Sequence, residues 1–237
     1  MRTIILLAIL CAANLTSSGQ ILISILLGDK LNSDKLEFGL DGGVNFSNLH
    51  GLDQSSTKTG FNLGFYFDIR MKNPSWMLHT GVQVKSTMGA AEVPVYSLGD
   101  PNLDNAFEGG SVKRKLGYFN LPVMMKYQWA NNFFVEAGPM FGLMARSTDE
   151  FTTTILKKDD LYYKLNIRDR YHPLDAGILV GLGHRLLGGN GMNIGVRYYY
   201  GLVDITVDDT TSNQQNRSFS IFAEIPIGVG KKTPAAE

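Results

Sequence analysis

Apolar and polar residues alternate with a period of two through much of this 237-residue chain. The clearest example runs from Asp175 to Leu202, where two alternating runs flank the glycine-rich segment Gly188–Gly191. Two such runs around a turn predict a β-hairpin. One face of each run is apolar, whereas the other mixes glycines with charged residues. Glycine within a strand indicates a close approach, so this second face is expected to line a narrow closed barrel whose apolar face contacts lipid.

The same alternation recurs in eight runs along the chain. The predicted strands lie at about residues 36–46, 61–71, 76–85, 118–129, 133–146, 175–186, 192–202 and 219–227. Each is long enough for a tilted bilayer crossing, which needs roughly 9–11 residues. The links after the second, fourth and sixth runs are short. The others are longer and polar, and two of them are expected to be loops at about 89–112 and 147–171. The pattern predicts an all-β fold, an eight-stranded antiparallel up-and-down transmembrane β-barrel in the outer membrane.

Charged residues of both signs fall on the predicted inward face. They are Glu37, Asp41, Asp68, Arg70, Lys85, Lys126, Glu136, Arg146, Asp175, Arg185, Arg197 and Glu224. Eight strands enclose a space that side chains just fill, and buried charges need partners. We therefore expect a structural network of charge pairs that plugs the lumen; a narrow ion path is the alternative. His79 shares this face and is expected to be hydrogen-bonded there.

Aromatic residues are expected at the two membrane interfaces. Those singled out by their places near strand ends are Trp76, Tyr127, Trp129, Phe133, Tyr198 and Tyr200. Pro122 and Pro139 fall within predicted strands, where each removes a ladder hydrogen bond, so a bulge or distortion is expected at each.

The N-terminus has the pattern of a secretory signal, with Arg2 before the short apolar core Ile4–Ala13. We expect a signal peptide at 1–19, a periplasmic segment at 20–34, the barrel at 35–229 and a tail at 230–237. The apolar segment Ile21–Leu27 is too short to span a membrane as a helix, and its role stays open.

Composition narrows the chemistry. The formal net charge is zero, which argues against nucleic-acid binding, and Cys11 is the single cysteine. The chain has no Gly-x-Ser-x-Gly elbow or phosphate loop, and its four histidines have no metal-ligand spacing. His50, Asp53 and Ser55 form only a weak hydrolase-like set. We therefore expect a non-enzymatic protein with no catalytic residues, cofactor or metal.

Several short segments in order resemble the outer-membrane-protein β-barrel domain family of Gram-negative bacteria, including its PorT-like members. They are Gly42–Leu49, Asn120–Val123, Glu136–Pro139, Gly181–Gly183 and Arg197–Leu202. The resemblance implies an eight-stranded outer-membrane barrel and, for PorT-like members, a link to protein secretion. The expected partners are outer-membrane lipid and lipopolysaccharide, with envelope or secretion proteins at the external loops, and the barrel is expected to be a monomer. A small-ligand transporter and a soluble lipocalin-like carrier with an apolar interior are the alternatives.

Overall fold

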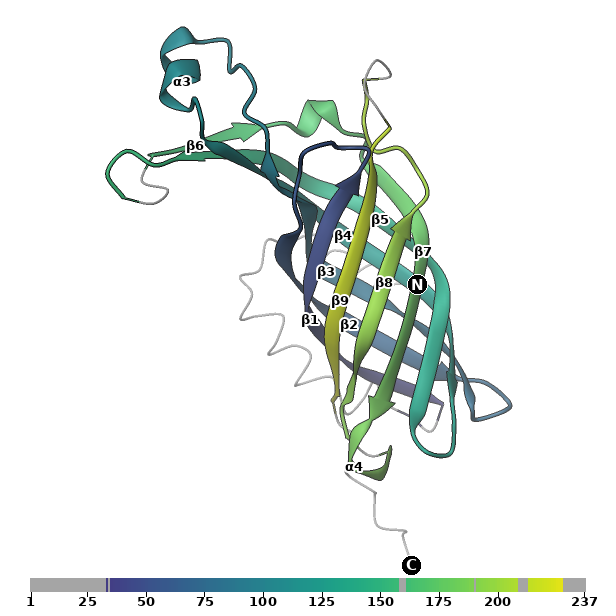
Figure 1. Cartoon of the computed structure of the whole chain (residues 1–237). Coiled ribbons are helices and arrows are strands. Elements are labelled where there is room, and N and C mark those ends of the chain that lie inside the picture. Colours follow the sequence, from purple (N-terminus) through teal and green to yellow (C-terminus); the bar gives the residue numbers. More distant parts are fainter. Residues whose placement is uncertain (1–32, 34, 158–160, 190, 209–212, 228–237) are drawn as a thin grey trace, which may run out of the picture.

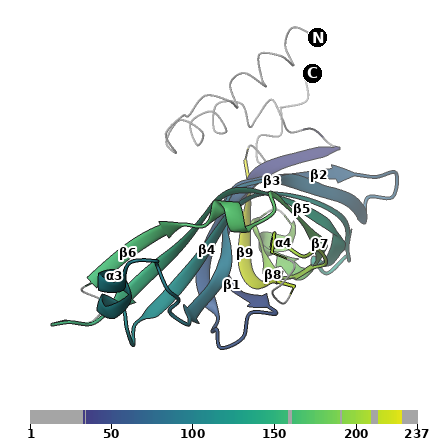
Figure 2. The same cartoon turned by 90° about the horizontal axis from the view of Figure 1, so that it is seen from above.

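The computed structural model describes residues 33, 35–157, 161–189, 191–208 and 213–227. Eight antiparallel strands form a closed ring (Figures 1 and 2). They are β1 (Leu36–His50), β2 (Lys58–Arg70), β3 (Trp76–Val93), β4 (Ser111–Gln128), β5 (Phe133–Thr153), β7 (Leu174–Arg185), β8 (Asn193–Gly201) and β9 (Gln215–Pro226). Each pairs with the next along this series, and β9 pairs with β1 to close the ring. The expected eight-stranded barrel is confirmed. The expected signal peptide, most of the expected periplasmic segment and the expected tail lie outside the described residues.

The strands place their apolar residues outward and their charged residues inward. Val180 and Ile194 are 44% and 41% exposed, whereas Asp68 and Arg197 are 1% and 3% exposed. Glycines make room for the long inward side chains: a Cβ at Gly181 would lie 2.8 Å from Glu136 Oε1 and 3.0 Å from Arg197 Cγ. This orientation excludes a lipocalin-like carrier, in which the apolar faces would enclose the lumen. Among the described residues, no helix has the length and apolar character needed to span a membrane.

Short and long connections are sorted to opposite ends of the ring, as the sequence predicted. Residues 71–75, 129–132 and 186–192 form the short links. The last of these contains the short segment α4 (Leu186–Gly189), in which Leu187 and Gly188 have positive φ angles. The links at 51–57, 94–110, 154–173 and 202–214 are longer and lie at the other end. In an outer-membrane barrel the short turns face the periplasm, which assigns the long links to the cell exterior.

A sheet extension that we call the arm rises at the long-loop end and leans to one side of the ring (Figures 1 and 2). It comprises residues 86–93 of β3, 111–117 of β4 and 146–153 of β5, together with β6 (Leu161–Asn166) and α3 (Pro101–Ala106). β6 pairs with the outer part of β5 and lies outside the ring. The 3₁₀-helix η1 (Arg168–Arg170) then leads the chain back to β7.

The prediction of polar loops at 89–112 and 147–171 is therefore wrong for much of both segments. Alternation continues there: Ser147, Asp149 and Phe151 are buried on one face of β5, with Thr148 and Glu150 partly exposed on the other. The polar composition of these segments hid the period, because the arm faces water on one side. α3 also has a clear local start, with the Asp100 carboxylate accepting from the Asn102 N–H at 2.8 Å just before Pro101.

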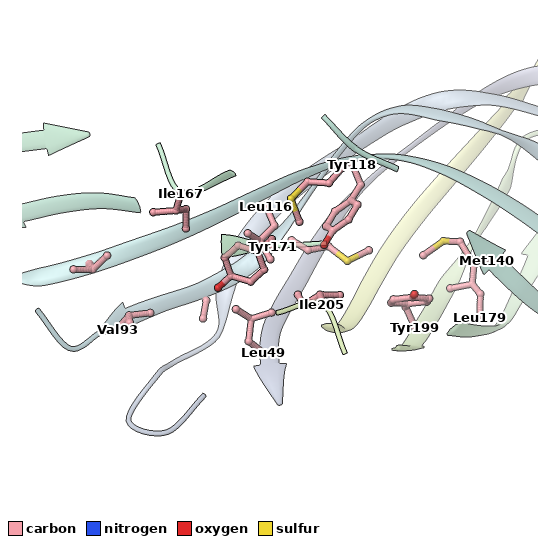
Figure 3. Packing of buried hydrophobic residues seen from close by; sticks show 14 of the residues in the cluster. Leu49, Val93, Leu116, Tyr118, Met140, Ile167, Tyr171, Leu179, Tyr199 and Ile205 are labelled. Carbon is pink, nitrogen blue, oxygen red and sulfur yellow. The ribbon is translucent and has the colours of Figure 1, made fainter. Parts of the chain in front are cut away.

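An apolar cluster fills the interior from the upper lumen into the arm (Figure 3). Leu116, Tyr118 and Met140 come from the strands, and Tyr171 and Ile205 come from the long links. In the arm, Phe151 packs edge-on against Tyr96 and Phe107 of the β3–β4 link, at centroid distances of 5.1 and 5.8 Å. The long links are thus folded onto the sheet and cover the outer end of the lumen.

Pro122 and Pro139 interrupt the hydrogen-bond ladder without changing its register. The pairing of β3 with β4 lapses between Thr80–Val123 and Gln83–Asn120, beside Pro122. The pairing of β4 with β5 lapses between Pro122–Met140 and Met125–Ala137, beside Pro139. The expected distortion is present at both prolines, whereas the bulges lie elsewhere.

Candidate functional site

The centre of the lumen is organised around Arg197 on β8. Its guanidinium donates to carboxylates from three other strands: to Glu136 Oε1 at 2.5 Å, to Asp41 Oδ1 at 3.3 Å, and to Glu224 through a short bond. The same group lies 3.7 Å from the centroid of the Phe222 ring. Charge-assisted bonds of this kind are strong, and here they tie β1, β5, β8 and β9 together across the barrel.

A second cluster joins this one on the side of the short turns. Lys126 Nζ donates to Asp68 Oδ2 at 2.8 Å and to Glu224 Oε2 at 3.4 Å. His79 Nδ1 lies 2.6 Å from Asp68 Oδ1, and Asn193 donates to Glu224 at 2.8 Å. His79 is therefore a hydrogen-bonded member of the network.

Asp68, His79 and Glu224 offer potential metal-ligand atoms within 4.8 Å of one another. This set does not suit a metal ion, because the ammonium of Lys126 and the guanidinium of Arg197 already neutralise its carboxylates. A divalent cation would have to displace both buried cations at a high electrostatic cost. The geometry is that of a salt-bridged interior.

Further pairs extend the network towards both ends. Arg185 donates to Glu37 Oε2 at 2.6 Å, and the Tyr66 hydroxyl donates to Glu37 Oε1 at 2.9 Å. Towards the long loops, Asp175 accepts from Asn216 at 2.8 Å. Asp175 is buried, and its Oδ2 accepts from this amide rather than from a cation.

Nine of the twelve charged residues that the sequence placed in the lumen are buried there. The inward prediction is wrong for Arg70, Lys85 and Arg146, which are exposed. Arg70 is the last residue of β2 and lies at the rim. Lys85 follows a register shift in β3, opposite Leu63 and Gly64 of β2. Arg146 follows a register shift in β5, opposite Gly117 and Tyr118 of β4. An extra residue in a strand reverses the face of every residue beyond it, so both cations point outward.

A small cavity lies between the charged network and the apolar cluster. It has a volume of about 20 Å³ and lies beside Gln83, Met140, Leu179, Arg197 and Tyr199. Space of this size holds about one water molecule.

The aromatic residues picked from the sequence all lie on the outer surface or at its rims. The Tyr127 ring contacts Trp76 in a tilted arrangement and Trp129 edge-on, at centroid distances of 4.9 and 5.1 Å, beside two short turns. Phe133 contacts His184 at 4.6 Å at the same end. Tyr198 and Tyr200 are exposed near the other end of β8, where Arg217 lies 3.6 Å from the Tyr200 ring centroid. These positions match the two ends of an apolar band.

The weak hydrolase-like set in the first long link is not assembled. The Ser55 hydroxyl donates to the Leu52 carbonyl at 2.9 Å, and no hydrogen bond joins Ser55, His50 and Asp53 in the described part of the chain.

Sequence reasoning missed a polar anchor inside the arm. Arg114 donates to both oxygens of Asp149, from Nε at 2.9 Å and from the terminal nitrogen at 2.6 Å, and the Tyr96 hydroxyl donates to Asp149 at 2.8 Å. Burial and the adjacent Asp149 carboxylate raise the pKa of Tyr96. Alternating Val112, Arg114 and Leu116 was the signal that could have revealed this strand pair.

The last long link is organised by Asp204. It accepts from the backbone N–H of Thr206 at 3.0 Å, from the Thr206 hydroxyl at 2.8 Å and from the Gln214 N–H at 2.9 Å. Partial burial opposes ionisation, but these hydrogen bonds outweigh it and lower the pKa of Asp204 below its ordinary value.

The closed ring, the outward apolar band and the charge-filled lumen define a small transmembrane β-barrel of the outer membrane. The chain belongs to the outer membrane protein beta-barrel domain family, whose model matches residues 29–207. None of the curated proteins compared with it gives a significant match.

Three solved structures align with most of this chain. Ail of Yersinia pestis is 10% identical, with 82% of this chain and 100% of Ail covered and a TM-score of 0.41. Neisserial surface protein A is 12% identical, with 79% and 96% covered and a TM-score of 0.42. AlkL, solved in lipid bilayers, is 15% identical, with 87% and 96% covered and a TM-score of 0.37.

Proposed function

We propose that this protein is a non-enzymatic outer-membrane barrel whose lumen is plugged by charge pairs and whose external arm binds other components of the cell envelope. The observation that carries the proposal is Arg197 bonded to Asp41, Glu136 and Glu224, which come from three different strands. An ion passing this point would have to separate buried, hydrogen-bonded charge pairs, and breaking such pairs is costly.

The alternative is a narrow pore or small-ligand transporter. The cavity beside Arg197 is the observation that favours it, because a chain of waters could begin there. Single-channel recording on the purified barrel in a planar bilayer separates the two. The plugged barrel gives no discrete conductance steps. Discrete steps that change in Arg197→Met, with the barrel folded on a heat-modifiable gel, would refute the plug.

The arm is the surface that we assign to partner binding. It adds strand β6 beyond the ring, with Tyr162 exposed on that strand, and it leaves the barrel on the exterior side. An edge strand of this kind can pair with a strand from another chain. Because the chain resembles PorT-like proteins, a component of protein secretion is the first candidate partner. The barrel itself is proposed to be a monomer.

Site-specific photo-crosslinking in intact cells tests this assignment. A photoreactive residue at Tyr162 is expected to give a protein adduct of defined mass. The matched control places it at Lys72, an exposed residue in a short turn at the opposite rim. Adducts at Lys72 alone, or at neither position, would refute binding through the arm.

A further inference from the structure

An open, basic groove lies where the arm meets the barrel. It has a volume of about 390 Å³ and is lined by Ala145–Thr148 of β5, by Lys164 and Asn166 of β6, and by Arg168 of η1. Three of its lining residues, Arg146, Lys164 and Arg168, are cationic, and none is a carboxylate. Arg146 and Lys164 are exposed and make no ion pair within the described residues. Glu150 is the cross-strand partner of Lys164, but its carboxylate is bonded to Lys115 at 2.5 Å. The groove therefore keeps a net positive charge that favours an anionic ligand.

The groove is partly built before any ligand arrives. The Arg168 guanidinium donates to the backbone carbonyls of Tyr171 at 3.0 Å and of Met144 at 3.4 Å. Its backbone N–H donates to the Asn166 side chain at 3.0 Å. These bonds fix the turn between β6 and β7 against β5 and hold one cation at the groove wall.

The groove continues the lipid-facing surface of the barrel. On β5, the outward residues directly below it are Phe141 and Leu143, which are about half exposed, and Leu174 of β7 pairs with Leu143. Arg146 lies on the same outward face. Its side chain covers Gly117 of β4, where an added Cβ would lie 2.9 Å from the Arg146 Cγ. Cationic side chains therefore follow the apolar band at its outer edge. A ligand that fits both surfaces has an anionic head directly above acyl chains.

The geometry points to a binding site for a phosphate of lipid A, the membrane anchor of outer-leaflet lipopolysaccharide, with Arg146 and Lys164 as its contacts. Guanidinium and ammonium groups are the side chains that bind phosphate in proteins, and basic residues at a membrane surface favour anionic lipid headgroups. This inference rests on the outer-membrane location of the barrel and not on a plugged lumen. It specifies one partner of the same external surface as the proposed function.

Titration of the purified barrel, in neutral detergent, with lipid A carrying both phosphates tests the site. Each cation near an anionic lipid surface contributes about fivefold in affinity, so Arg146→Gln with Lys164→Gln is expected to weaken binding roughly thirtyfold. The matched control, Lys35→Gln with Lys72→Gln, removes two exposed cations at the opposite rim and should change affinity less than about twofold. Lys164→Gln alone should weaken it about fivefold, which keeps the test available if the double variant folds poorly.

Two further titrations distinguish lipid A from other phosphate-bearing lipids. Dephosphorylated lipid A is expected to bind the native barrel as weakly as the double variant binds lipid A. Phosphatidylglycerol at equal negative charge is expected to bind at least tenfold more weakly than lipid A. If dephosphorylated lipid A or phosphatidylglycerol bound as tightly as lipid A, the site would be refuted. Equal losses of lipid A affinity in the two double variants would also refute it. A heat-modifiable gel shift confirms that each variant is folded, and failure here leaves crosslinking at Tyr162 as a separate result.

Discussion

Lys85 and Lys126 provide a direct test of how charge is placed in this barrel, because alternation alone puts both of them in the lumen. Lys126 is 1% exposed, bonded to Asp68 and Glu224, and lies 4.3 Å from the Phe134 ring centroid. Lys85 is exposed beyond a register shift. Replacing each with methionine removes one charge and keeps most of the side-chain volume.

Lys126→Met leaves Asp68 and Glu224 with fewer countercharges in a buried site. Removing one partner of a buried ion pair costs about 3–5 kcal/mol, which lowers the folding equilibrium constant roughly a hundredfold or more. Lys85→Met loses no buried partner, so a change within about 0.5 kcal/mol is expected.

Urea titration of the detergent-folded barrel, with the folded fraction read from the heat-modifiable gel shift, measures both free energies of unfolding. Adding Asp68→Asn to Lys126→Met should recover part of the loss, because the orphaned carboxylate is then neutral. If Lys126→Met costs less than about 1 kcal/mol, or if the two single variants lose the same amount, the assignment of Lys126 to a buried charge network is refuted.

Three further outcomes follow from the same contacts. Tyr96→Phe removes a hydrogen bond to the Asp149 carboxylate, worth about 1.5–3 kcal/mol, so the 94–110 link should be cleaved roughly ten to a hundred times faster in limited proteolysis, while Glu108→Gln, at an exposed position of the same link, serves as the control. Folding lowers the pKa of Asp204, so its stabilisation of the last long link should be complete above its ordinary pKa of 3.8. That stabilisation should be lost as the pH falls through the lower pKa that Asp204 has in the folded protein. The protection factor of the Thr206 amide against hydrogen exchange, which corrects for the intrinsic pH dependence of exchange, should therefore fall in acid. Asp204→Asn should remove most of that dependence; an identical acid response in the variant would contradict it. Trp129→Ala should lower stability in lipid vesicles by about 1–2 kcal/mol and by less in detergent, and equal losses in the two media would argue against an interfacial role.

The sequence predicted the ring because its signal is local and repeats. Outward Val180 and inward Arg197 follow from a period of two, which each strand carries independently. The partners of Arg197 could not be predicted, since they depend on which inward residues of β1, β5 and β9 reach the same level of the barrel. The arm was missed for a different reason. Its strands are half solvated, and the 94–110 link between two of them is rich in Gly, Asp and Asn, which is typical of loops.

The register shifts explain both the misplaced cations and the presence of the arm. One extra residue lies in β3 between Gln83 and Ser86, and another lies in β5 beside the Gly117–Tyr118 step of β4, so the two flank β4 near the same level. Bulges increase local twist and bend a strand, which is the change that a sheet needs to leave a cylinder. Beyond them the exchanged faces bring Met88 and Phe151 inward to form the core of the arm. The same exchange turns Arg146 outward above the apolar band. A single kind of backbone irregularity therefore builds the arm core and places a cation of its basic groove.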